Sequence, residues 1–167
     1  METKNLDIYG HAPLPWSRAR DALAASRGPS VTFFLGTVRP EGTPHAAGLG
    51  AVWVDDALWF VTGPSTRKAR NLALNPACTI SCRLAGIDLV LEGHASRVAD
   101  HDALERLASI YREAGWPAEV REDAFTAPFS APSAGPPPWH LYRLELHTAF
   151  GVATEEPYGA TRWRFDR

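Results

Sequence analysis

The segment VTFFLGTVRPEGTPHAAGLGAVWVDDALWFVT (residues 31–62) combines runs of apolar, β-branched and aromatic residues with short groups of turn formers. The runs at 31–38, 45–54 and 57–62 are typical of β-strands. RPEGTP and the pair Asp55–Asp56 separate them, and their composition is typical of turns. Because strands joined by such short turns pair with each other, the segment predicts a three-stranded antiparallel meander.

The rest of the chain continues with strand and helix patterns. ACTISCRL (77–84) has apolar residues at every second position, which is typical of a strand with one buried face. Residues 116–138 are rich in Pro, Ala and Ser and predict a long connection without regular structure. The architecture expected is one domain, residues 1–167, mostly β with short helices, closed or nearly closed. Further strands are predicted at 87–99, 139–154 and 160–165, and helices at 16–26 with Ser17 as cap, at 66–75, and at 100–115 with Asp100 or Asp102 as cap.

Composition restricts the class of protein. At 167 residues the chain is long enough for a core of its own, and 45% hydrophobic and 22% charged residues are ordinary for a globular protein. A net charge of −2 gives no support to nucleic-acid binding. No apolar run approaches the roughly 18 residues of a membrane span, and residues 1–18 lack the apolar region of a signal peptide. We therefore expect a cytoplasmic protein without nucleic-acid or membrane partners.

Two cysteines, Cys78 and Cys82, lie on the apolar face of the strand predicted at 77–84. At about 3.3 Å per residue their Cα atoms are about 13 Å apart, whereas a disulfide needs less than about 7 Å. We therefore expect two buried free thiols, as is usual in a reducing cytoplasm.

The helix predicted at 66–75 has an unusual charge distribution. It follows Ser65, a capping type of residue, and carries Arg67, Lys68 and Arg70 in its first turns. A helix N-terminus is already positive and has unpaired N–H groups, so acidic residues are the usual choice there. One interpretation is a solvated cationic face. The other is a site for an anion such as a phosphate, bound by the N–H groups, a hydroxyl group and the cations.

The positions of the side chains around the helix help to decide between these two interpretations. A helical wheel places Ala69, Leu72 and Ala73 toward the sheet, Arg67 and Arg70 away from it, and Lys68 beside the apolar stripe. A dianion would remove the mismatch between the cations and the helix dipole. The wheel and the dipole together favour the phosphate interpretation.

A second stretch fits the same site. Residues 46–51, AAGLGA, leave almost no side chain on either face of the predicted strand. Glycine within a strand marks a close approach by a ligand or another chain, unless a tightly packed interior requires small residues. With a phosphate site one strand and one helix further on, the stretch is consistent with a planar heterocycle linked to a phosphate.

TVRPEGTPHAAGLGAVW (37–53), LWFVTGPSTRKARNLALNPACTISC (58–82) and LVLEGHASRV (89–98) resemble the pyridoxamine-phosphate-oxidase-like family of flavin and deazaflavin oxidoreductases. The resemblance implies a six- to seven-stranded antiparallel split β-barrel with short flanking helices. It also implies a homodimer that binds FMN or the deazaflavin coenzyme (F420) at the subunit interface. The cofactor-binding residues that it implies are Ala47, Gly48, Leu49, Val61, Thr62, Ser65, Thr66, Arg67 and Lys68.

Two departures from the family pattern narrow the function. Pyridoxamine-phosphate oxidases carry an Arg near the start of the second strand and a Lys at its end, where this chain has Ala47 and Val52. Vitamin B6 oxidation is therefore not expected, and the deazaflavin coenzyme is favoured over FMN. The function expected is hydride transfer to or from a small organic substrate. The alternative is a non-enzymatic flavin- or haem-binding carrier or stress protein of the same fold.

The remaining polar residues form no catalytic or metal-binding pattern. His45 could face the cofactor ring or hydrogen-bond a neighbouring strand, and Asp88 could form a salt bridge or meet the cofactor of the partner subunit. A flavin carries the redox chemistry itself, so no catalytic acid or base is named. No metal-ligand spacing is found among His94, His101, His140 and His147.

Overall fold

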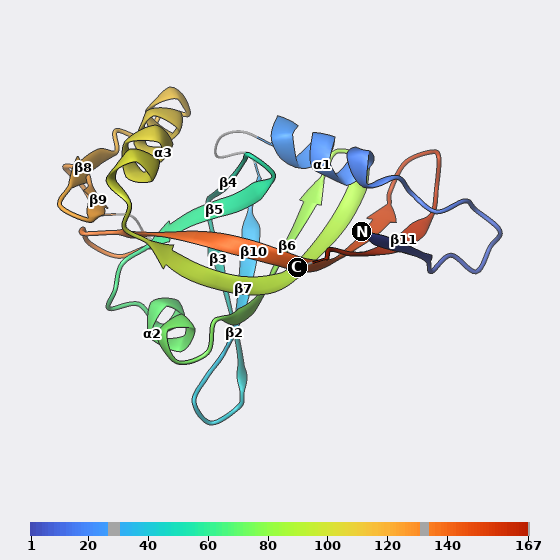
Figure 1. Ribbon diagram of the computed structural model, residues 1–167, viewed down its shortest axis with the longest axis horizontal. Coiled ribbons are helices and arrows are strands. Elements are labelled where there is room, and N and C mark those ends of the chain that lie inside the picture. Colours follow the sequence, from blue (N-terminus) through green and yellow to red (C-terminus); the bar gives the residue numbers. More distant parts are fainter. Residues whose placement is uncertain (27–30, 131–133, 167) are drawn as a thin grey trace.

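The computed structural model describes residues 1–26, 31–130 and 134–166. In these ranges the chain forms a large antiparallel sheet with three short helices, α1 (Trp16–Ala25), α2 (Arg67–Leu74) and α3 (His101–Glu113) (Figure 1). The mostly β fold class predicted from the sequence is confirmed. In the described ranges, none of the helices is long and apolar enough to cross a membrane. The strands are β1 (Glu2–Asn5), β2 (Phe33–Val38), β3 (Pro44–Leu49), β4 (Ala51–Val54), β5 (Ala57–Thr62), β6 (Ala77–Leu84), β7 (Ile87–Val98), β8 (Glu119–Arg121), β9 (Ala124–Thr126), β10 (His140–Ala153) and β11 (Ala160–Arg164).

The main sheet has nine strands, with β1-β11-β10-β7-β6-β2-β3 as hydrogen-bonded neighbours, β5 paired with β10 and β4 paired with β5. The sequence predicted seven strands, and two differences from that prediction explain why the sheet has nine. β1 is added at the edge, and the strand predicted at 45–54 is divided at Gly50 into β3 and β4. Within the described ranges β3 pairs with β2 and β4 with β5, so the hydrogen-bonded path does not close into a ring.

The turn between β4 and β5 is formed by the predicted residues. Asp55 and Asp56 have φ angles of 50° and 54°, and the flanking Val54 and Ala57 are paired. Two residues with positive φ form the tight turn that matches the twist of a β-hairpin, and Asp tolerates this conformation well. Both antiparallel pairings of the predicted meander are confirmed, but its middle strand is divided at Gly50, so the three predicted strands do not form one continuous meander.

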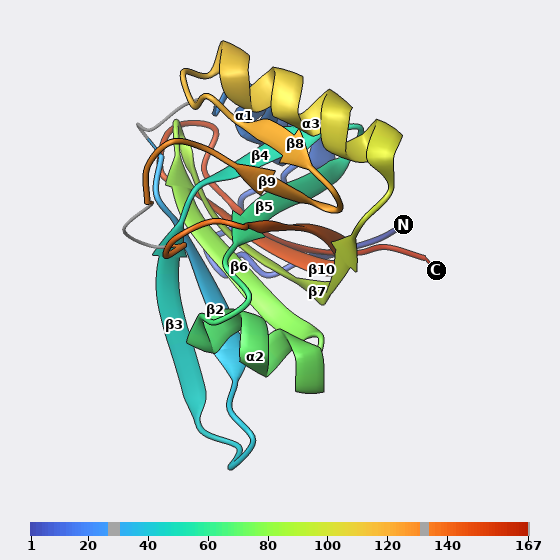
Figure 2. The same cartoon turned by 90° about the vertical axis from the view of Figure 1, so that its left-hand side faces the viewer.

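Strand β10 joins the two halves of the sheet. Its residues 140–144 pair with β5 and its residues 148–152 with β11, while the opposite edge pairs with β7 along most of its length. The register shifts between Leu146 and Thr148, which makes His147 the extra residue of a β-bulge. The hairpin of β2 and β3 extends away from this centre, with α2 at its side (Figure 2).

Two apolar clusters fill the molecule. The first lies inside the curved sheet and combines side chains of β2, β6, β7 and β10 with α1. The second lies under α3 and includes Leu107 of that helix and Trp139. β5 contributes to both clusters, because its side chains alternate between Phe60 in the first and Trp59 in the second.

Several local predictions need correction. α1 begins after Pro15 without a side-chain cap, so Ser17 is not its cap. The connection 116–138 contains a hairpin, β8–β9, which is attached to the fold by the pairing of Phe125 with Trp139. β1 has four exposed residues, ETKN, with no apolar alternation, and it forms a strand because it can pair with the edge of β11.

The predicted cap of the third helix is confirmed. α3 starts at Asp100, whose carboxylate accepts the N–H of Ala103 (2.9 Å).

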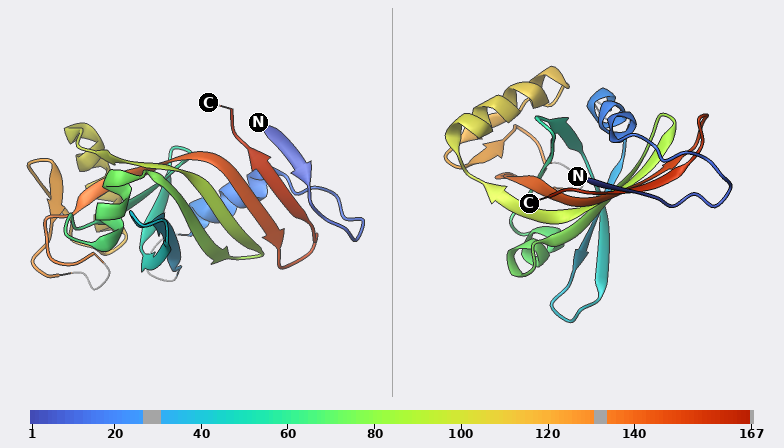
Figure 3. Two further views of the ribbon diagram at one scale, coloured as in Figure 1. Left: turned by 90° about the horizontal axis from the view of Figure 1, so that it is seen from below. Right: turned by 45° about the vertical axis from the view of Figure 1, so that its right-hand side comes forward.

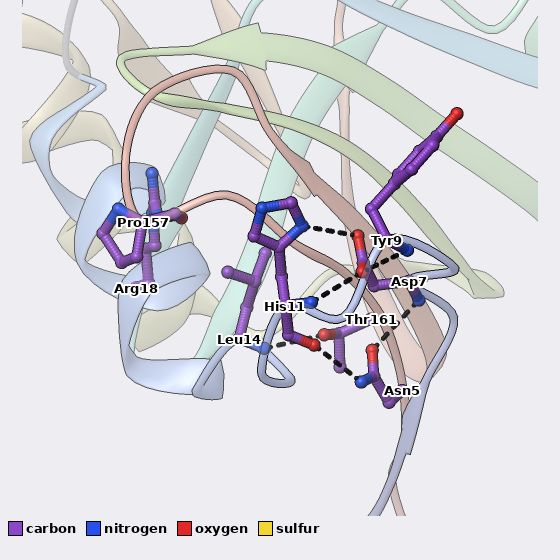
Figure 4. A network of polar contacts seen from close by, with 8 residues as sticks. All are labelled: Asn5, Asp7, Tyr9, His11, Leu14, Arg18, Pro157 and Thr161. Carbon is purple, nitrogen blue, oxygen red and sulfur yellow. Dashed lines mark hydrogen bonds and ion pairs between the residues drawn. The ribbon is translucent and has the colours of Figure 1, made fainter.

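The segment between β1 and α1 is held by polar contacts of one carboxylate (Figure 4). Asp7 accepts hydrogen bonds from the backbone N–H groups of His11 (2.8 Å) and Tyr9 (2.9 Å), and lies 3.1 Å from Nδ1 of His11. These bonds, that of the His11 N–H above all, lower the pKa of Asp7. The N–H of Leu14 then donates to Thr161 of β11 (2.8 Å). The segment is thereby fixed at the end of the sheet remote from α2 (Figure 3).

The two cysteines of β6 behave as predicted. Cys78 and Cys82 are free, buried and part of the first apolar cluster. Burial raises the pKa of each thiol to about 12. They are inert core residues at neutral pH, because the reactive species of cysteine is the thiolate.

Candidate functional site

The start of α2 is tied to the end of β5 by two threonines. The N-cap is Thr66 rather than Ser65: its hydroxyl accepts the N–H of Ala69 (3.3 Å) and donates to the carbonyl of Gly63 (2.9 Å). Thr62 is fully buried, and its Oγ1 lies 2.9 Å from Oγ1 of Thr66. Since the hydroxyl hydrogen of Thr66 points to Gly63, Thr62 is the donor of this pair. The hydroxyl of Thr66 can bind a ligand only by giving up its Gly63 contact.

The buried face of α2 differs from the one that the helical wheel predicted. Ala69 and Leu72 are buried as expected, but Ala73 is exposed, and Lys68 and Asn71 are buried in its place. Lys68, Asn71 and Leu72 are three and four residues apart and therefore share one side of the helix. That side includes a polar contact to the sheet, which an analysis of apolar positions alone does not anticipate.

The three cations of α2 occupy different surroundings. Lys68 is only 4% exposed, and burial lowers the pKa of its ammonium group. Arg67 and Arg70 are exposed, as predicted. Arg70 also closes the first turn, because its Nη1 donates to the carbonyl of Ser65 (2.7 Å). Of these three cations, Lys68 is the one that the fold buries.

A chain of hydrogen bonds leads from α2 to β3. Nδ2 of Asn71 donates to the hydroxyl of Thr37 (2.9 Å), and this hydroxyl donates to the carbonyl of His45 (3.4 Å). Thr37 on β2 and His45 on β3 are directly opposite each other. Paired residues of antiparallel strands project to the same face of a sheet. His45 therefore lies on the face that α2 covers.

Two nitrogen atoms on the β2–β3 hairpin are buried without a hydrogen-bond partner among the described residues: Nδ1 of His45 and Nε of Arg39. Burial lowers the pKa of His45, and the charges of Arg39, Arg67 and Lys68 lower it further. These four residues, Arg39, His45, Arg67 and Lys68, are called the basic cluster below. An opposing carboxylate, that of Glu41, lies at the exposed tip of the hairpin, with its Oε1 3.8 Å from Nη1 of Arg39.

The basic cluster has the donor set that a phosphate requires. Its groups are cations or ring nitrogens, and phosphate oxygens accept charge-assisted hydrogen bonds from such donors. Buried donors without partners are rare in native structures, and a bound acceptor is one way to satisfy them. The cluster also lies next to the N-terminus of α2, which favours negative charge.

The small residues of β3 are open to their surroundings. A Cβ added to Gly48 would come no closer than 3.7 Å to another atom, and one added to Gly50 would meet nothing within 4 Å. The packing of this chain therefore does not require glycine at these positions, which removes the interpretation as a tight interior there. Ala47, on the opposite face from Gly48, is partly exposed between His45 and the buried Leu49.

The predicted site residues fall into two groups. Ser65, Thr66, Arg67 and Lys68 follow Thr62 at the start of α2, and the hydrogen bonds through Asn71 and Thr37 connect this group to the strand of Ala47, Gly48 and Leu49. Val61 is turned to the second apolar cluster, so only its backbone is available on the side of Thr62. Sequence reasoning missed Arg39, Thr37 and Asn71. The mid-helix Asn71 offered the one available signal, since Asn is poorly suited to a helix interior.

Other concave regions occur among the described residues, and one of them borders the β2–β3 hairpin at Thr37 and Pro44. One cavity, of about 770 Å³, lies between α1, the β4–β5 turn and α3, with Asp55, Asp56 and Glu113 in its lining. A second, of about 520 Å³, is lined by His94 and His147, whose rings are 4.5 Å apart. The sequence had left these two histidines unconnected. Within the described ranges no group of three or more potential metal ligands occurs.

Asp88 forms the salt bridge that was one of its two predicted roles. Its carboxylate accepts from Nε (2.7 Å) and Nη2 (2.8 Å) of Arg83 on the neighbouring strand. The hydrogen bond from Arg83 lowers the pKa of Asp88. The Arg83 side chain is exposed and that of Asp88 partly so, and the pair therefore contributes little to stability.

Comparison with known families identifies the chain over most of its length. Residues 19–152 match the model of the pyridoxamine 5'-phosphate oxidase family. The sequence has no match among curated proteins.

Solved structures share the fold at low sequence identity. General Stress Protein 26 from Bacillus anthracis is 17% identical, with a TM-score of 0.59 over 91% of this chain and 100% of that chain. An F420 reductase is 18% identical, with a TM-score of 0.54 over 78% of this chain and 94% of that chain. A heme binding protein from Mycobacterium smegmatis is 16% identical, with a TM-score of 0.61 over 89% of this chain and 58% of that chain. At these identities the likeness concerns the fold.

Proposed function

The chain belongs to the pyridoxamine 5'-phosphate oxidase family, and we propose that it is an oxidoreductase that binds a deazaflavin or FMN cofactor. The observation that carries the proposal is that two features adjoin on the β2–β3 hairpin. One is the basic cluster at the start of α2; the other is the open strand of small residues, β3. A single ligand would occupy both features if its phosphate bound to the basic cluster and its flat ring lay along β3.

The residues of the chain bind and orient this ligand. Arg67 and Lys68 neutralise the phosphate, and the N–H groups at the start of α2 add hydrogen bonds. The backbone of Ala47, Gly48 and Leu49 supports the ring, because Gly48 has open space at its Cβ position and Ala47 carries only a methyl group. When bound, the cofactor supplies hydride transfer to or from a small organic substrate. We assign no side chain as acid or base.

The face of the sheet remote from the core supports a homodimer with the cofactor at its interface. Phe34 and Val152 are each 52% exposed and Val90 is 37% exposed. In the strand register, Val90 lies opposite Phe150 on one side and opposite Ser81 on the other, and Ser81 lies opposite Phe34. Phe150, Val90 and Phe34 therefore lie in one row across the sheet, with Ser81 between Val90 and Phe34, and Val152 lies on the same face two residues beyond Phe150. An exposed apolar row of this kind marks an interaction surface, and we propose a second copy of the chain as its partner.

The cofactor proposed first is the deazaflavin coenzyme, with FMN second. Pyridoxamine-phosphate oxidases use basic residues where this chain has Ala47 and Val52, and Val52 is buried in the second apolar cluster. The strand thus offers the ring no cation, and vitamin B6 oxidation is not proposed. The free thiols of β6 fit the reducing cytoplasm.

Cofactor titration tests this function. We expect F420 or FMN to bind and change its fluorescence, and riboflavin, which lacks the phosphate, to bind at least about 100-fold more weakly. The absorption spectrum of the purified protein identifies any bound cofactor, and oxidation of the reduced cofactor by model acceptors separates an enzyme from a carrier. Equal affinity for riboflavin and FMN, or a haem spectrum, contradicts the proposal.

A further inference from the structure

We propose that Arg39 and His45, on the β2–β3 hairpin, form a second arm of the anion site opposite α2, and that His45 takes up a proton when the anion binds. The inference rests on the proposed function for the location of the site. It adds two residues that belong to the hairpin rather than to the helix, and it makes ligand affinity depend on pH.

Hydrogen bonds and strand register place the hairpin residues next to α2. Lys68 and Asn71 share the buried side of α2, and Asn71 hydrogen-bonds Thr37 (2.9 Å). Thr37 is the cross-strand partner of His45 and projects to the same face. His45 therefore lies next to the side of α2 that carries Lys68. Arg39 follows β2 at the turn, where its N–H bonds the carbonyl of Thr43 (2.9 Å).

The hairpin arm has hydrogen-bonding capacity that the described residues do not use. Nδ1 of His45 and Nε of Arg39 are both buried and have no partner in the described part of the chain. A water-filled surface would satisfy such atoms, but these two are shielded from solvent. An oxygen-rich anion between the hairpin and α2 would accept from both nitrogens.

The charges around His45 set the sign of the proton effect. Arg39 on the hairpin and Arg67 and Lys68 on α2 all act on its ring, while Glu41 lies at the exposed tip. Without a ligand, burial and these cations lower the pKa of His45 and keep the ring neutral at neutral pH. A dianion reverses the local field and raises the pKa of His45. Between these two pKa values binding takes up a proton, so affinity falls as the pH rises.

Sulfate is the probe that isolates this effect, because it keeps two charges throughout the pH range of histidine titration. The ring C–H signals of His45, assigned with His45→Gln, are followed by NMR from about pH 5 to about pH 8 with and without sulfate. We expect sulfate to raise the pKa of His45 and to bind about tenfold more tightly at the acidic end, since one pKa unit corresponds to a factor of about ten. His45→Gln should abolish the pH dependence, whereas His101→Gln, an exposed histidine of α3, should retain it.

Arg39→Gln tests the second residue of the arm. Loss of one charge-assisted contact should weaken sulfate binding by about tenfold or more. Arg20→Gln on α1 makes the same change of net charge at the opposite side of the molecule from α2 and should bind sulfate like the unchanged protein (Figure 1).

The outcomes separate this inference from the proposed function. If sulfate shifts the backbone signals of Arg67 and Lys68 but leaves the pKa of His45 unchanged, the hairpin arm is overturned while the helix site stands. If sulfate raises the pKa of His45 but neither FMN nor F420 binds, the anion site stands and the proposed function fails. If sulfate affects neither group of signals, the inference is overturned as well.

Discussion

Gly93 and Gly48 lie in the same sheet but in opposite surroundings. A Cβ on Gly93 of β7 would lie 1.9 Å from the carbonyl oxygen of Glu145 on β10, and one on Gly151 of β10 would lie 2.7 Å from the ring of Trp163. A Cβ on Gly48 of β3 would meet its nearest atom, a methyl group of Thr32, at an ordinary contact distance of 3.7 Å. The fold requires small residues where β7 and β10 pack, and does not require them on β3.

This contrast separates residues needed for folding from residues available to a ligand. β7 and β10 are central strands with partners on both edges, so their small residues are explained within the chain. β3 is the last strand of its hydrogen-bonded path and adjoins the basic cluster. The four predictions that follow test whether the two regions differ as the geometry indicates.

The largest effect is expected at the central strands. Gly93→Ala forces a methyl group onto a backbone carbonyl that cannot move without disturbing the β7–β10 pairing. We expect a loss of about 3 kcal/mol or more in the free energy of unfolding, which lowers the melting temperature by roughly 6–12 °C. Thermal unfolding followed by circular dichroism measures it. Gly48→Ala is the matched control and should change the melting temperature by no more than about 2 °C; equal losses in the two variants would remove the contrast.

The next effect concerns the basic cluster. Lys68→Ala removes one charge-assisted contact to the proposed phosphate, which should weaken FMN or F420 binding by roughly 10- to 100-fold. Fluorescence titration measures the affinity. Arg70→Ala, also on α2 but exposed and directed to the carbonyl of Ser65, should bind the cofactor nearly as well as the unchanged protein. Unchanged affinity of Lys68→Ala would mean that the start of α2 is a structural feature of the fold.

A smaller effect is expected at the proposed dimer face. Phe34→Asp places a charge at the β2 end of the apolar row, where Phe34 is 52% exposed and belongs to neither apolar cluster of the core. We expect the unchanged protein to sediment as a dimer at low micromolar concentration, and the variant to dissociate at roughly tenfold higher concentration or more. Sedimentation of the unchanged protein as a folded monomer of about 18 kDa refutes the dimer.

The smallest effect concerns the core thiols. Cys78 and Cys82 are buried with pKa values raised to about 12, so almost no thiolate exists at neutral pH. A thiol reagent added to the native protein at about pH 7 should react very slowly, and the denatured protein without reductant should show two thiols per chain. Rapid reaction of the native protein would show that β6 opens to solvent, as expected of the β3 region rather than of the core.

Several features of the fold are readable from local sequence. The alternation in 77–84 identified β6 and the buried face of its cysteines, and the Asp55–Asp56 pair identified the turn between β4 and β5. The cap Asp100 marked the start of α3. These features depend on neighbouring residues and on the periods of strands and helices, so a single segment carries their signal.

Only part of the candidate site could be predicted from local sequence. Arg67 and Lys68 stand out because cations at a helix N-terminus contradict the helix dipole. Nothing local distinguishes Thr66 from Ser65 as the cap, since the choice depends on Thr62 at the end of β5. The burial of Lys68 likewise depends on the contact of Asn71 with Thr37, a residue 34 positions earlier in the chain.

The remaining features come from contacts between distant segments. β1 has no apolar pattern and exists because β11, at the other end of the chain, lies beside it. The division of the second meander strand at Gly50 follows from its two halves pairing with different strands, β2 and β5. The role proposed for His45 also depends on tertiary structure, because Nδ1 is buried without a partner among the described residues only in the folded chain, where Asn71 of α2 bonds its strand neighbour Thr37. Local residue patterns specify which segments become strands, helices and turns, whereas burial and polar satisfaction are properties of surroundings that only tertiary packing creates.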